Sequence, residues 1–492
     1  MKFLAFDLGA ESGRAVLGTL DRDRIALDVF ARFPNIPKLT DGHWHWDTRR
    51  FFEAMNDALR AALAKHPDLD TVGCDTWGVD YATLDHGGRL IGDPYCYRDS
   101  RTDGIMERAF ARLPREEIYR ETGCQFMPFN TCYQFLAATL GEGPAWKDVG
   151  GVLWMADYFH YLLSGKRIAE VSLASTSQFY DPARRAWSRK ILDAFGAPLS
   201  VLPPLSPSGE TLGGLAPALG FGAAGARVKV VAPCSHDTGC AFAAVPAEGD
   251  DWACISSGTW SLLGAELEKP CIHDAARDLG FTNEVGVDHT IRFLRNIIGL
   301  WLVQECRRAW EAEGRKYDYP TLARLAAEAA PFGPLVDPDD PRFVKPGEMP
   351  RKLADACRET DQPAPEGVGA LVRCAYESLA LEYRHVLGKL EKALGRRFAA
   401  LHVVGGGSQN SLLGQLTADA IGRPVIAGPA EATALGNCLI QAKGLKAVKD
   451  RAHLRRIVRN SFELRRYEPK EAAKWDAHYA RFLDLKRRAG RA

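Results

Sequence analysis

A unit of strand, Ser-Gly turn and second strand occurs near the start of each half of the chain. Ser12-Gly13 follows an apolar strand expected from Phe3 to Phe6, and Ser257-Gly258 follows one expected from Trp252 to Ser256. Each turn leads into an apolar or small-residue run that ends in Leu-Gly. So short a match does not exclude chance similarity between two hairpins. A true duplication predicts two domains built on one plan.

Hydrophobic periodicity predicts further strands and helices between and after these units. The N-terminal turn continues into strands at Arg14–Leu20 and Ala26–Phe33, which completes an antiparallel meander, and Asp47 caps an amphipathic helix. A hairpin at His86–Gly88 returns through a strand from Leu90 to Tyr97. The later elements that we expect are a helix from Phe293 to Glu311, a helix from Gly367 to Leu394, a strand from Ala400 to Val404 and a helix from Ser411.

The length of 492 residues predicts two or three domains at about 150 residues each. The stretch 244–251, AVPAEGDD, combines the Pro, Gly and charges typical of a linker. We therefore expect an N-terminal domain over 1–245 and a second domain over 250–442. A Lys/Arg-rich extension over 443–492 carries interleaved Leu, Phe, Tyr and Trp, which predicts surface helices.

Charge and cysteine usage restrict the class of protein. Lys+Arg 63 against Asp+Glu 62 leaves a net charge of +1, so the chain has no global field to hold nucleic acid or an anionic membrane. The 12 cysteines are scattered singly, without a C-x-x-C pair, as small buried residues in a reducing compartment would be. With neither a secretory leader nor a membrane-length apolar run, we expect a cytoplasmic protein.

Asp237 is the best-placed carboxylate for accepting a proton. The apolar run Val228–Val231 reads as a buried strand, Pro233 breaks it, and Ser-His-Asp-Thr then opens a helix of small residues. This places Asp237 where a strand ends and a helix begins. A helix N-cap without any chemistry is the alternative interpretation, because a carboxylate at that position is stabilised by the free backbone N–H groups.

The segment Asp7–Arg14, DLGAESGR, is a glycine turn whose backbone N–H groups could converge on a phosphate. It matches neither the Walker A nor the dinucleotide-binding glycine pattern, and an ordinary structural hairpin is the alternative. Asp7 ends the first strand and is a plausible magnesium ligand. Glu11 conflicts with this interpretation unless its side chain points away, because a carboxylate repels phosphate.

Other polar residues also suggest ligand contacts. Gly405–Gly407 lies where a strand meets a helix, which allows a nucleotide to approach the backbone or simply allows tight packing. Asn296 and Gln304 fall on one face of the expected helix, where they need a ligand or neighbouring loops as partners. Asp75 and Asp80 interrupt a strand, either to bind hydroxyl groups or because the strand is an exposed edge.

Seven motifs along residues 7 to 410 resemble those of the FGGY family of carbohydrate kinases. In chain order they are DLGAESGR, DTWGVDY, YRDSRT, SHDT, SSGTWSL, NIIGLWLVQ and VVGGGSQN. Each is weak evidence alone, but their number and order make coincidence improbable. The resemblance implies an α/β fold of two actin-like, ribonuclease H-like ATPase domains, each with a mixed sheet of about five strands, and an active site in the cleft between them.

The resemblance also implies roles for individual residues. Asp237 would be the catalytic base of an ATP-dependent kinase that phosphorylates a small deoxy-ketose at its primary hydroxyl, with L-rhamnulose ahead of L-fuculose or a xylulose. The implied cofactors are ATP and Mg²⁺, with Asp7 at the metal, and the chain would be a monomer or homodimer. The residues implied to bind ATP are Ala10, Glu11, Ser12, Gly13, Arg14, Thr259, Gln304 and Gly406. Those implied to bind the sugar are Gly78, His236, Asp237, Thr238 and Asn296.

Two other functional classes stay open on the sequence. An actin-like protein could bind nucleotide and sugar as a switch or sensor without transferring phosphate. A Rossmann-type oxidoreductase is less well supported, because the chain lacks both G-x-G-x-x-G and a suitably placed ribose-binding acid.

Overall fold

The computed structural model describes residues 1–489, and the chain divides into two compact units. Among the described residues, unit 1 contains 1–244, 266–293 and 432–461, and unit 2 contains 245–265, 294–431 and 462–489. The units are therefore not consecutive halves, because two later segments pack with the N-terminal residues. The residues expected to form a separate extension are shared between the units.

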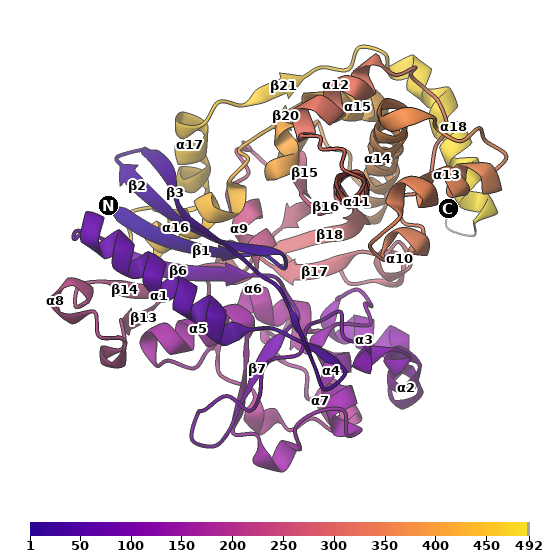
Figure 1. Ribbon diagram of the computed structural model, residues 1–492. Coiled ribbons are helices and arrows are strands. Elements are labelled where there is room, and N and C mark those ends of the chain that lie inside the picture. Colours follow the sequence, from indigo (N-terminus) through magenta and orange to yellow (C-terminus); the bar gives the residue numbers. More distant parts are fainter. Residues whose placement is uncertain (490–492) are drawn as a thin grey trace. The chain divides into compact units, whose positions relative to one another are not determined.

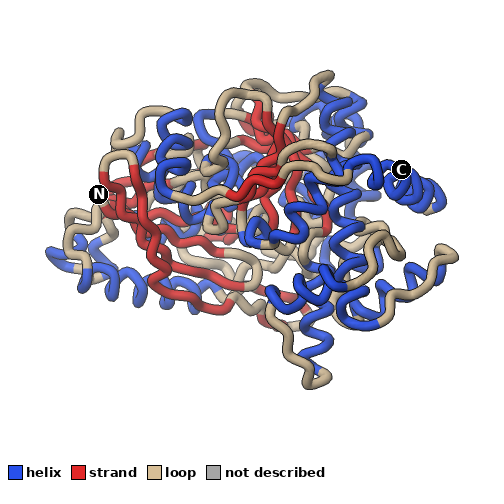
Figure 2. The backbone as a smooth tube through the Cα atoms, turned by 90° about the horizontal axis from the view of Figure 1, so that it is seen from above, coloured by secondary structure: helices blue, strands red, loops and turns tan. Residues whose placement is uncertain are grey.

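Unit 1 is built on a six-stranded sheet, one strand more than the resemblance implies. The strands, in sheet order, are β13 (Glu210–Gly214), β14 (Lys229–Ala232), β6 (Thr71–Thr76), β1 (Lys2–Leu8), β2 (Ser12–Asp21) and β3 (Arg24–Pro34). β14, β6 and β1 run parallel, whereas β2, β3 and β13 pair antiparallel to their neighbours. The expected N-terminal meander is confirmed (Figures 1 and 2).

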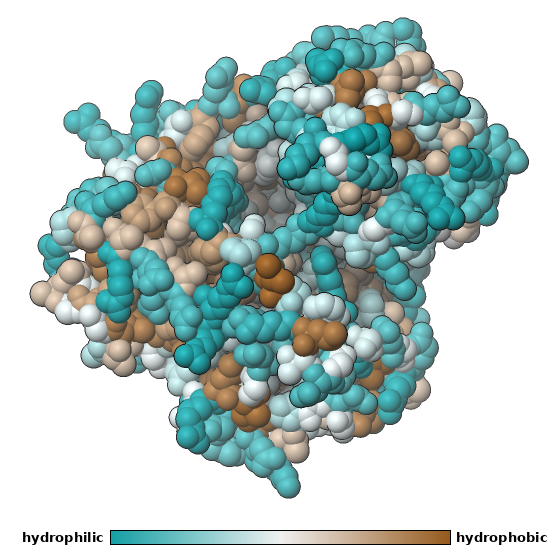
Figure 3. Space-filling view, viewed as in Figure 1, coloured by the Kyte–Doolittle hydropathy of each residue, from teal (hydrophilic) through white to brown (hydrophobic). Residues whose placement is uncertain are grey.

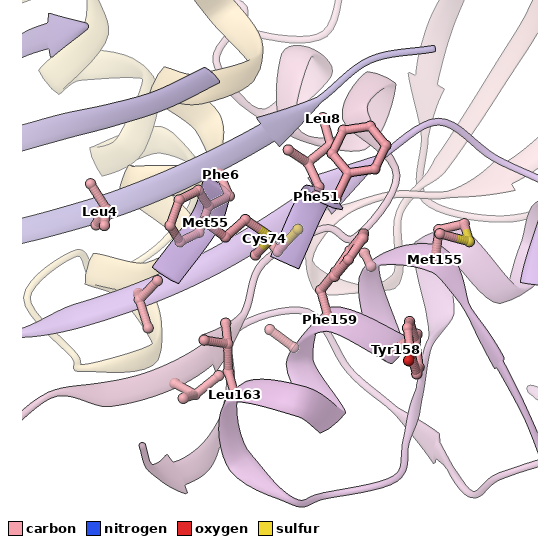
Figure 4. Close-up of a cluster of buried hydrophobic side chains, with 14 of the residues drawn as sticks. Leu4, Phe6, Leu8, Phe51, Met55, Cys74, Met155, Tyr158, Phe159 and Leu163 are labelled. Carbon is pink, nitrogen blue, oxygen red and sulfur yellow. The ribbon is translucent and has the colours of Figure 1, made fainter. Parts of the chain in front are cut away.

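Side chains alternate between the two faces of this sheet, as the period of two in a strand requires. On one face Leu4, Phe6 and Cys74 are fully buried against α1 (Thr48–Lys65) and α5 (Met155–Ser164), where Figure 4 shows them beside Met55 and Phe159. Each such side chain contributes about 1.5 to 3 kcal/mol by leaving water. The sheet's opposite face carries polar side chains among apolar ones such as Phe3 and Ala5. There Thr71 and Asp75 bond to Gln441 and Asn437 of α16 (Ala432–Gly444).

Unit 1 contains further helices and several minor strands besides this sheet. As expected, Asp47 caps α1 by accepting a hydrogen bond from the Arg50 backbone N–H. The other helices are α2 (Ile105–Arg112), α3 (Arg115–Thr122), α4 (Thr131–Thr139), α6 (Val171–Ala174), α7 (Arg189–Phe195), α8 (Gly222–Gly225), α9 (Asp237–Ala243), α10 (Asp274–Asp278) and α17 (Arg451–Ser461). The minor strands are β4 (Lys38–Thr40), β5 (His43–His45), β7 (Tyr81–Leu84), β8 (Gly151–Trp154), β9 (Ala169–Glu170), β10 (Tyr180–Asp181), β11 (Ala186–Trp187), β12 (Leu205–Ser206) and β17 (Thr282–Val285).

The prediction of a strand from Leu90 to Tyr97 is wrong. The turn after β7 closes as expected, with the Asp85 N–H donating to the Arg89 carbonyl. The returning chain, however, makes isolated bridges at Leu90 with Leu84 and at Tyr95 with His45 instead of a strand. Gly92 takes a positive φ of 68°, which bends the chain away from the ladder. β7 pairs instead with β8, almost 70 residues later in the chain.

Unit 2 is built on a second sheet in which six strands follow one another. They are, in sheet order, β18 (Ile291–Ile298), β16 (Trp260–Leu267), β15 (Trp252–Ser257), β19 (Ala400–Val404), β20 (Val425–Ala427) and β21 (Arg465–Tyr467). β15 and β16 form the second strand, Ser-Gly turn and strand unit that the sequence predicts, and β19 has the predicted bounds. β15, β19 and β20 run parallel.

The helix expected from Phe293 to Glu311 is wrong in its first half. Residues up to Ile298 form β18, and the helix α11 begins only at Trp301. The run Ile-Arg-Phe-Leu is buried on both sides of the strand, so its periodicity resembles that of a buried helix, and Gly299 separates the two elements. Asn296 and Gln304 therefore do not share a helix face.

Helices cover the sheet of unit 2. They are α11 (Trp301–Ala312), α12 (Tyr319–Glu328), α13 (Met349–Glu359), α14 (Gly367–Leu394), α15 (Ser411–Ile421) and α18 (Ala472–Arg488). The bounds of α14 and the start of α15 agree with the sequence prediction. α18 buries Trp475, Phe482 and Lys486, and the Lys486 ammonium bonds to Asp337 at 2.8 Å and Glu382 at 2.7 Å. The C-terminal helix is thus docked by a buried ion cluster as well as by apolar contacts.

The surface is largely hydrophilic on the side that Figure 3 shows. On the face shown in Figure 3, hydrophilic residues predominate and hydrophobic ones occur in small separate groups. Over residues 1–489, none of the helices combines the length and the apolar character that crossing a membrane requires. All 12 cysteines are free, and all but Cys271 are buried, as expected.

Close packing of α16 on α9 predicts that Gly436 tolerates no side chain. A Cβ at this position would lie 1.9 Å from the Cys240 carbonyl oxygen, so Gly436→Ala forces the two helices apart. We expect the free energy of unfolding in urea to fall by at least about 1 to 3 kcal/mol. Gly388→Ala is the matched control, because Gly388 lies in helix α14 with open space around it and should gain up to about 1 kcal/mol. If the two substitutions changed the free energy of unfolding equally, the close packing of α16 on α9 at Gly436 would be contradicted.

Candidate functional site

The carboxyl ends of β1, β6 and β14 lie together at one edge of the sheet of unit 1. Asp7 is in register with Asp75, and Thr76 forms a parallel bridge with His236, the residue before Asp237. Ligands of open α/β sheets bind at the carboxyl ends of the strands. All the unit 1 residues implied for the site, from Asp7 and the phosphate turn to Gly78 and Asp237, therefore gather at this edge.

Asp237 begins α9, and His236 is the residue that precedes the helix. Its carboxylate is held through one oxygen. Oδ1 accepts hydrogen bonds from the Thr238 backbone N–H at 2.5 Å and the Thr238 hydroxyl at 3.0 Å, and His236 Nε2 lies 3.3 Å from the same atom. The side chain of Asp237 is 33 % exposed, whereas that of His236 is 10 % exposed. The carboxylate is thus fixed on one side and accessible on the other.

The loop before Asp237 is anchored by the buried Glu170, which the sequence analysis did not single out. Its carboxylate accepts hydrogen bonds from the Ser235 N–H at 2.8 Å and from the Ser172 and Ser208 hydroxyls. The Ser172 hydroxyl in turn accepts the His236 N–H at 3.1 Å. Burial raises the pKa of Glu170, against the lowering effect of these donors. With the backbone N–H groups of Ser172 and Leu173, five donors on one buried carboxyl group hold the backbone that carries Asp237 in place.

The glycine turn Asp7–Arg14 is closed by its own backbone and by Asn35. The Gly9 N–H donates to the Ser12 carbonyl at 2.9 Å, and the Asn35 side chain donates to the Gly9 carbonyl at 2.9 Å. Gly13 must be glycine, because a Cβ there would lie 2.2 Å from the Phe33 ring. Ala10 is half-buried, and Glu11 and Ser12 are exposed.

Arg14 and Asp7 form an ion pair at the end of this turn. The Arg14 guanidinium donates to Asp7 Oδ2 through Nε at 2.9 Å and Nη2 at 2.7 Å. Arg14 is 24 % exposed and Asp7 only 9 %. The residue implied for ATP phosphates and the one implied for magnesium thus hold each other at the edge of the sheet.

Gly78, implied to bind the sugar, stands next to a strained residue. Val79 has a φ of 69°, a left-handed conformation that a β-branched side chain adopts only when its surroundings enforce it. Here the Val79 N–H donates to the Thr176 hydroxyl and its carbonyl accepts from the Thr131 hydroxyl at 2.6 Å. A Cβ at Gly78 would meet Thr176 at 3.2 Å. The strain marks this turn as a site where backbone position matters.

Asp80 anchors the same turn, and it is fully buried rather than at an exposed edge. Its carboxylate accepts the indole N–H of Trp46 at 2.6 Å and of Trp77 at 2.9 Å, the Tyr97 N–H at 3.1 Å and the Gln134 amide at 3.0 Å. Burial raises the pKa of Asp80 to about 6, although these donors favour the charged form. Its role is to hold the polypeptide around Gly78.

The unit 2 residues implied for ATP also gather at one edge. Thr259, in the second Ser-Gly turn, donates its hydroxyl to the Gln304 amide oxygen at 3.1 Å. Gly405 and Gly407 pack directly on Ser257, where a Cβ on Gly407 would lie 2.0 Å from the serine hydroxyl. Gly406 between them is exposed and has open space on the side where a Cβ would stand. Tight packing therefore explains Gly405 and Gly407 but not Gly406.

Asn296 lies in β18, which leads into the same edge of unit 2. The Gly299 N–H donates to the Thr259 carbonyl at 3.1 Å, so the end of β18 is held against the second Ser-Gly turn. Asn296 is half-buried.

The sequence analysis missed two charged residues that contact His236. Glu284 Oε2 lies 3.2 Å from His236 Nδ1 and 3.0 Å from Arg292 Nη1, and Arg292 is completely buried. Burial raises the pKa of Glu284, but the charge of Arg292 and the contact with His236 outweigh it, so the pKa lies below its ordinary value. The sequence did contain a signal for them. Glu284 and Arg292 are single charges inside the apolar segments TNEV and IRFL, and because buried charges are almost always paired, two such charges of opposite sign suggest an ion pair.

Two family descriptions cover most of the chain. Residues 2–244 match the N-terminal domain, and residues 253–445 the C-terminal domain, of the FGGY family of carbohydrate kinases. The chain belongs to the FGGY family of carbohydrate kinases. Sugar kinases of this family use ATP, and the resemblance read from the seven motifs is confirmed.

Curated relatives and solved structures agree with this assignment. The chain is 40 % identical to a rhamnulokinase of Bacteroides thetaiotaomicron over 489 residues, which covers 99 % of both chains. It is 39 % identical to a rhamnulokinase of Pectobacterium carotovorum, over 98 % of this chain and 96 % of the relative.

Among solved structures, the FGGY kinase resembles a ligand-bound xylulose kinase from Lactobacillus acidophilus with a TM-score of 0.82 at 15 % identity, over 99 % of this chain and 98 % of the other. It also resembles a Plasmodium falciparum glycerol kinase with ADP, with a TM-score of 0.78 at 15 % identity, over 99 % and 97 %. These likenesses establish the two-domain kinase fold.

The raised pKa of Asp80 predicts a specific dependence of stability on pH. The folded protein keeps the Asp80 proton up to about pH 6, whereas the unfolded chain releases it near pH 3.8. The stabilisation that the protonated Asp80 provides is therefore complete below pH 3.8 and is lost as the pH rises through about 6. The free energy of unfolding of the wild type minus that of Asp80→Asn should fall by up to about 3 kcal/mol between pH 4 and pH 7.

Urea unfolding at several pH values measures this difference, and Asp85→Asn is the control of opposite sign. The backbone hydrogen bond from Arg89 lowers the pKa of Asp85, so its contribution grows as pH rises from below that pKa. A difference for Asp80 that rises with pH would contradict the assignment.

Proposed function

We propose that the protein phosphorylates a small deoxy-ketose at its primary hydroxyl, converting L-rhamnulose to L-rhamnulose 1-phosphate, with Asp237 as the general base. The observation that carries the proposal is the full-length identity of about 40 % to proteins named rhamnulokinase. The accessible carboxylate of Asp237 at the strand-to-helix junction supplies a suitable proton acceptor.

Asp237 would orient the sugar hydroxyl and accept its proton as the bond to the γ-phosphorus forms. Such general-base catalysis contributes about 10² to 10⁴ in rate. His236 and Thr238 would contact the sugar from the same loop and Gly78 from the neighbouring strand end, and Asn296 of β18 stays a proposed sugar contact. Water has to be excluded during transfer, because it would otherwise compete with the sugar for the phosphoryl group.

The residues proposed to hold ATP lie in the two Ser-Gly turns and in the segments that follow them. Ala10, Glu11, Ser12, Gly13 and Arg14 belong to the first Ser-Gly turn, and Thr259 to the second. Backbone N–H groups and the Arg14 guanidinium would stabilise the charge that spreads over the phosphate oxygens in the transition state. Gln304 and Gly406 would contact the rest of the nucleotide.

Asp7 fits a magnesium ion that enters with ATP. Its carboxylate is a hard oxygen donor beside the phosphate turn, and Mg²⁺ needs only one or two such groups beside water and phosphate oxygens. The neighbouring Asp75 is buried, and burial raises its pKa well above the ordinary value, with the charges of Asp7 and Asp237 acting in the same direction. When bound, the ion would neutralise charge on the phosphates.

Replacement of the proposed base tests the role of Asp237. Asp237→Asn keeps the shape but removes the basic oxygen, so kcat with L-rhamnulose should fall about 10²- to 10⁴-fold. ATP affinity, measured by calorimetry, should be unchanged. Asp250→Asn, at an exposed position in 246–251, is the control and should keep full activity. Turnover near the wild-type rate would reject Asp237 as the base.

The open space at Gly406 allows a test of ATP binding that does not disturb the fold. Gly406→Ala should change the free energy of unfolding by no more than about 0.5 kcal/mol, and should raise the KM for ATP, because the added methyl group would enter the nucleotide's space. Gly407→Ala is the contrasting variant and should destabilise the protein, since its Cβ clashes with Ser257. An unchanged KM for ATP in Gly406→Ala would remove this residue from the site.

A panel of ketoses with ATP and Mg²⁺, followed by coupled ADP release, tests the substrate. We expect L-rhamnulose to give a higher kcat/KM than L-fuculose or a xylulose. Differences of about 1 to 3 kcal/mol in pocket contacts decide such preferences. Transfer to none of them, with ATP still bound, would favour the sensor over the kinase.

A further inference from the structure

We propose that the buried ion pair of Glu284 and Arg292 sets the tautomer of His236, and through it aims the carboxylate of Asp237 so that Oδ2 is the oxygen that takes the sugar's proton. This inference rests on the proposed function, because it assigns positioning roles for the same transfer. All four residues belong to unit 1. Glu284 and Arg292 act only through His236.

His236 stands between the ion pair and Asp237. Its Nδ1 lies 3.2 Å from Arg292 Nη2, with the geometry of a hydrogen bond, and 3.2 Å from Glu284 Oε2 at ion-pair distance. Its Nε2 lies 3.3 Å from Asp237 Oδ1. The imidazole ring therefore connects a fully buried charge to a partly exposed carboxylate.

Arg292 cannot change its role in this contact. An arginine donates hydrogen bonds only and keeps its charge at every pH that a protein tolerates. Its Nε and Nη2 donate to the Val285 carbonyl at 3.2 and 3.0 Å, which fixes the plane of the guanidinium. Glu284 Oε2 lies at the same distance from Nδ1 but has no hydrogen-bond partner among residues 1–489, whereas Nη2 and Nδ1 meet with the geometry of a hydrogen bond. We therefore assign Nδ1 as the acceptor, which places the proton of the neutral ring on Nε2.

The protonated Nε2 then lies on the side of the ring that faces Asp237. It stands 3.3 Å from Oδ1, within ion-pair distance of the oxygen that already accepts both Thr238 donors. The structure gives Oδ2 no polar contact with any residue in 1–489, so this oxygen keeps its lone pairs for the sugar hydroxyl. In the transfer, the hydroxyl proton goes to Oδ2 while the sugar oxygen bonds to the γ-phosphorus and the bond to ADP breaks.

Glu284 offsets the free-energy cost of burying the Arg292 guanidinium. A buried guanidinium without a counter-charge is strongly destabilising, and Glu284 supplies that charge at 3.0 Å. The pair therefore has two separable effects. Charge balance keeps unit 1 folded, and the donor on Nη2 selects the tautomer of His236.

Removing the pair singly and together separates these effects. Arg292→Met removes the donor and leaves Glu284 unpaired, and Glu284→Gln leaves Arg292 unpaired, so both should lower the melting temperature. The double variant Glu284→Gln/Arg292→Met buries no charge, so its melting temperature should recover. We expect its kcat to stay about 10- to 100-fold low, with the KM for ATP unchanged, because Asp237 is no longer aimed.

The control is a second ion pair of the chain, Arg423 with Glu391, in unit 2. The double variant Glu391→Gln/Arg423→Met should keep the wild-type kcat. A stable Glu284→Gln/Arg292→Met protein with wild-type kcat would overturn the inference, since a purely structural pair predicts that outcome. Inactivity of the wild type toward every ketose would instead refute the proposed function.

Nitrogen-15 NMR of histidine-labelled protein reads the tautomer without relying on activity. The His236 signals, assigned by their loss in His236→Gln, should show a protonated Nε2 in the wild type and a mixture of tautomers in Arg292→Met. A wild-type ring protonated on Nδ1 alone would contradict the tautomer assignment even if the kinetic results agreed.

Discussion

The parallel pairing of β1, β6 and β14 is the constraint on which the site of unit 1 depends. Because the three strands run in one direction, their carboxyl ends meet at one edge, and the loops that follow must lie side by side there. This is how Asp7, Gly78 and Asp237, separated by up to 230 residues in the chain, reach a common place. Apolar packing on one face and the Asp75–Asn437 contact on the other hold the strands in register.

The polar residues around this edge are arranged to hold backbone and carboxylate positions rather than to stabilise the fold as such. Glu170 gathers donors from the loop before Asp237, Asp80 gathers donors around Gly78, and Glu284 balances Arg292 behind His236. Buried charged groups contribute little net stability, because desolvation offsets the attraction. Their concentration at one edge is understandable in a protein whose activity depends on placing a proton acceptor and a phosphoryl group accurately.

Local patterns predicted much of the candidate site. The strand, Ser-Gly turn and strand units, the start of a helix at Asp237 and the junction at Gly405–Gly407 all follow from periodicity and turn chemistry, and all occur as predicted. The error at Phe293–Glu311 has a physical cause. A strand that is buried on both faces has no alternation, so the period that distinguishes strand from helix is absent. This is why Asn296 was assigned to the wrong element.

By itself, the sequence determined the membership of the chain in a kinase family, many of the local elements and the choice of Asp237 as the candidate proton acceptor. Short-range periodicity, glycine turns and ordered motifs lie in consecutive residues, so the sequence alone contains them. The tertiary structure alone decided that residues 266–293 and 432–461 join the N-terminal unit, and that Glu284 and Arg292 therefore stand behind His236. These contacts connect residues that are far apart in the chain, and side-chain packing over the whole unit selects them, so no local pattern encodes them.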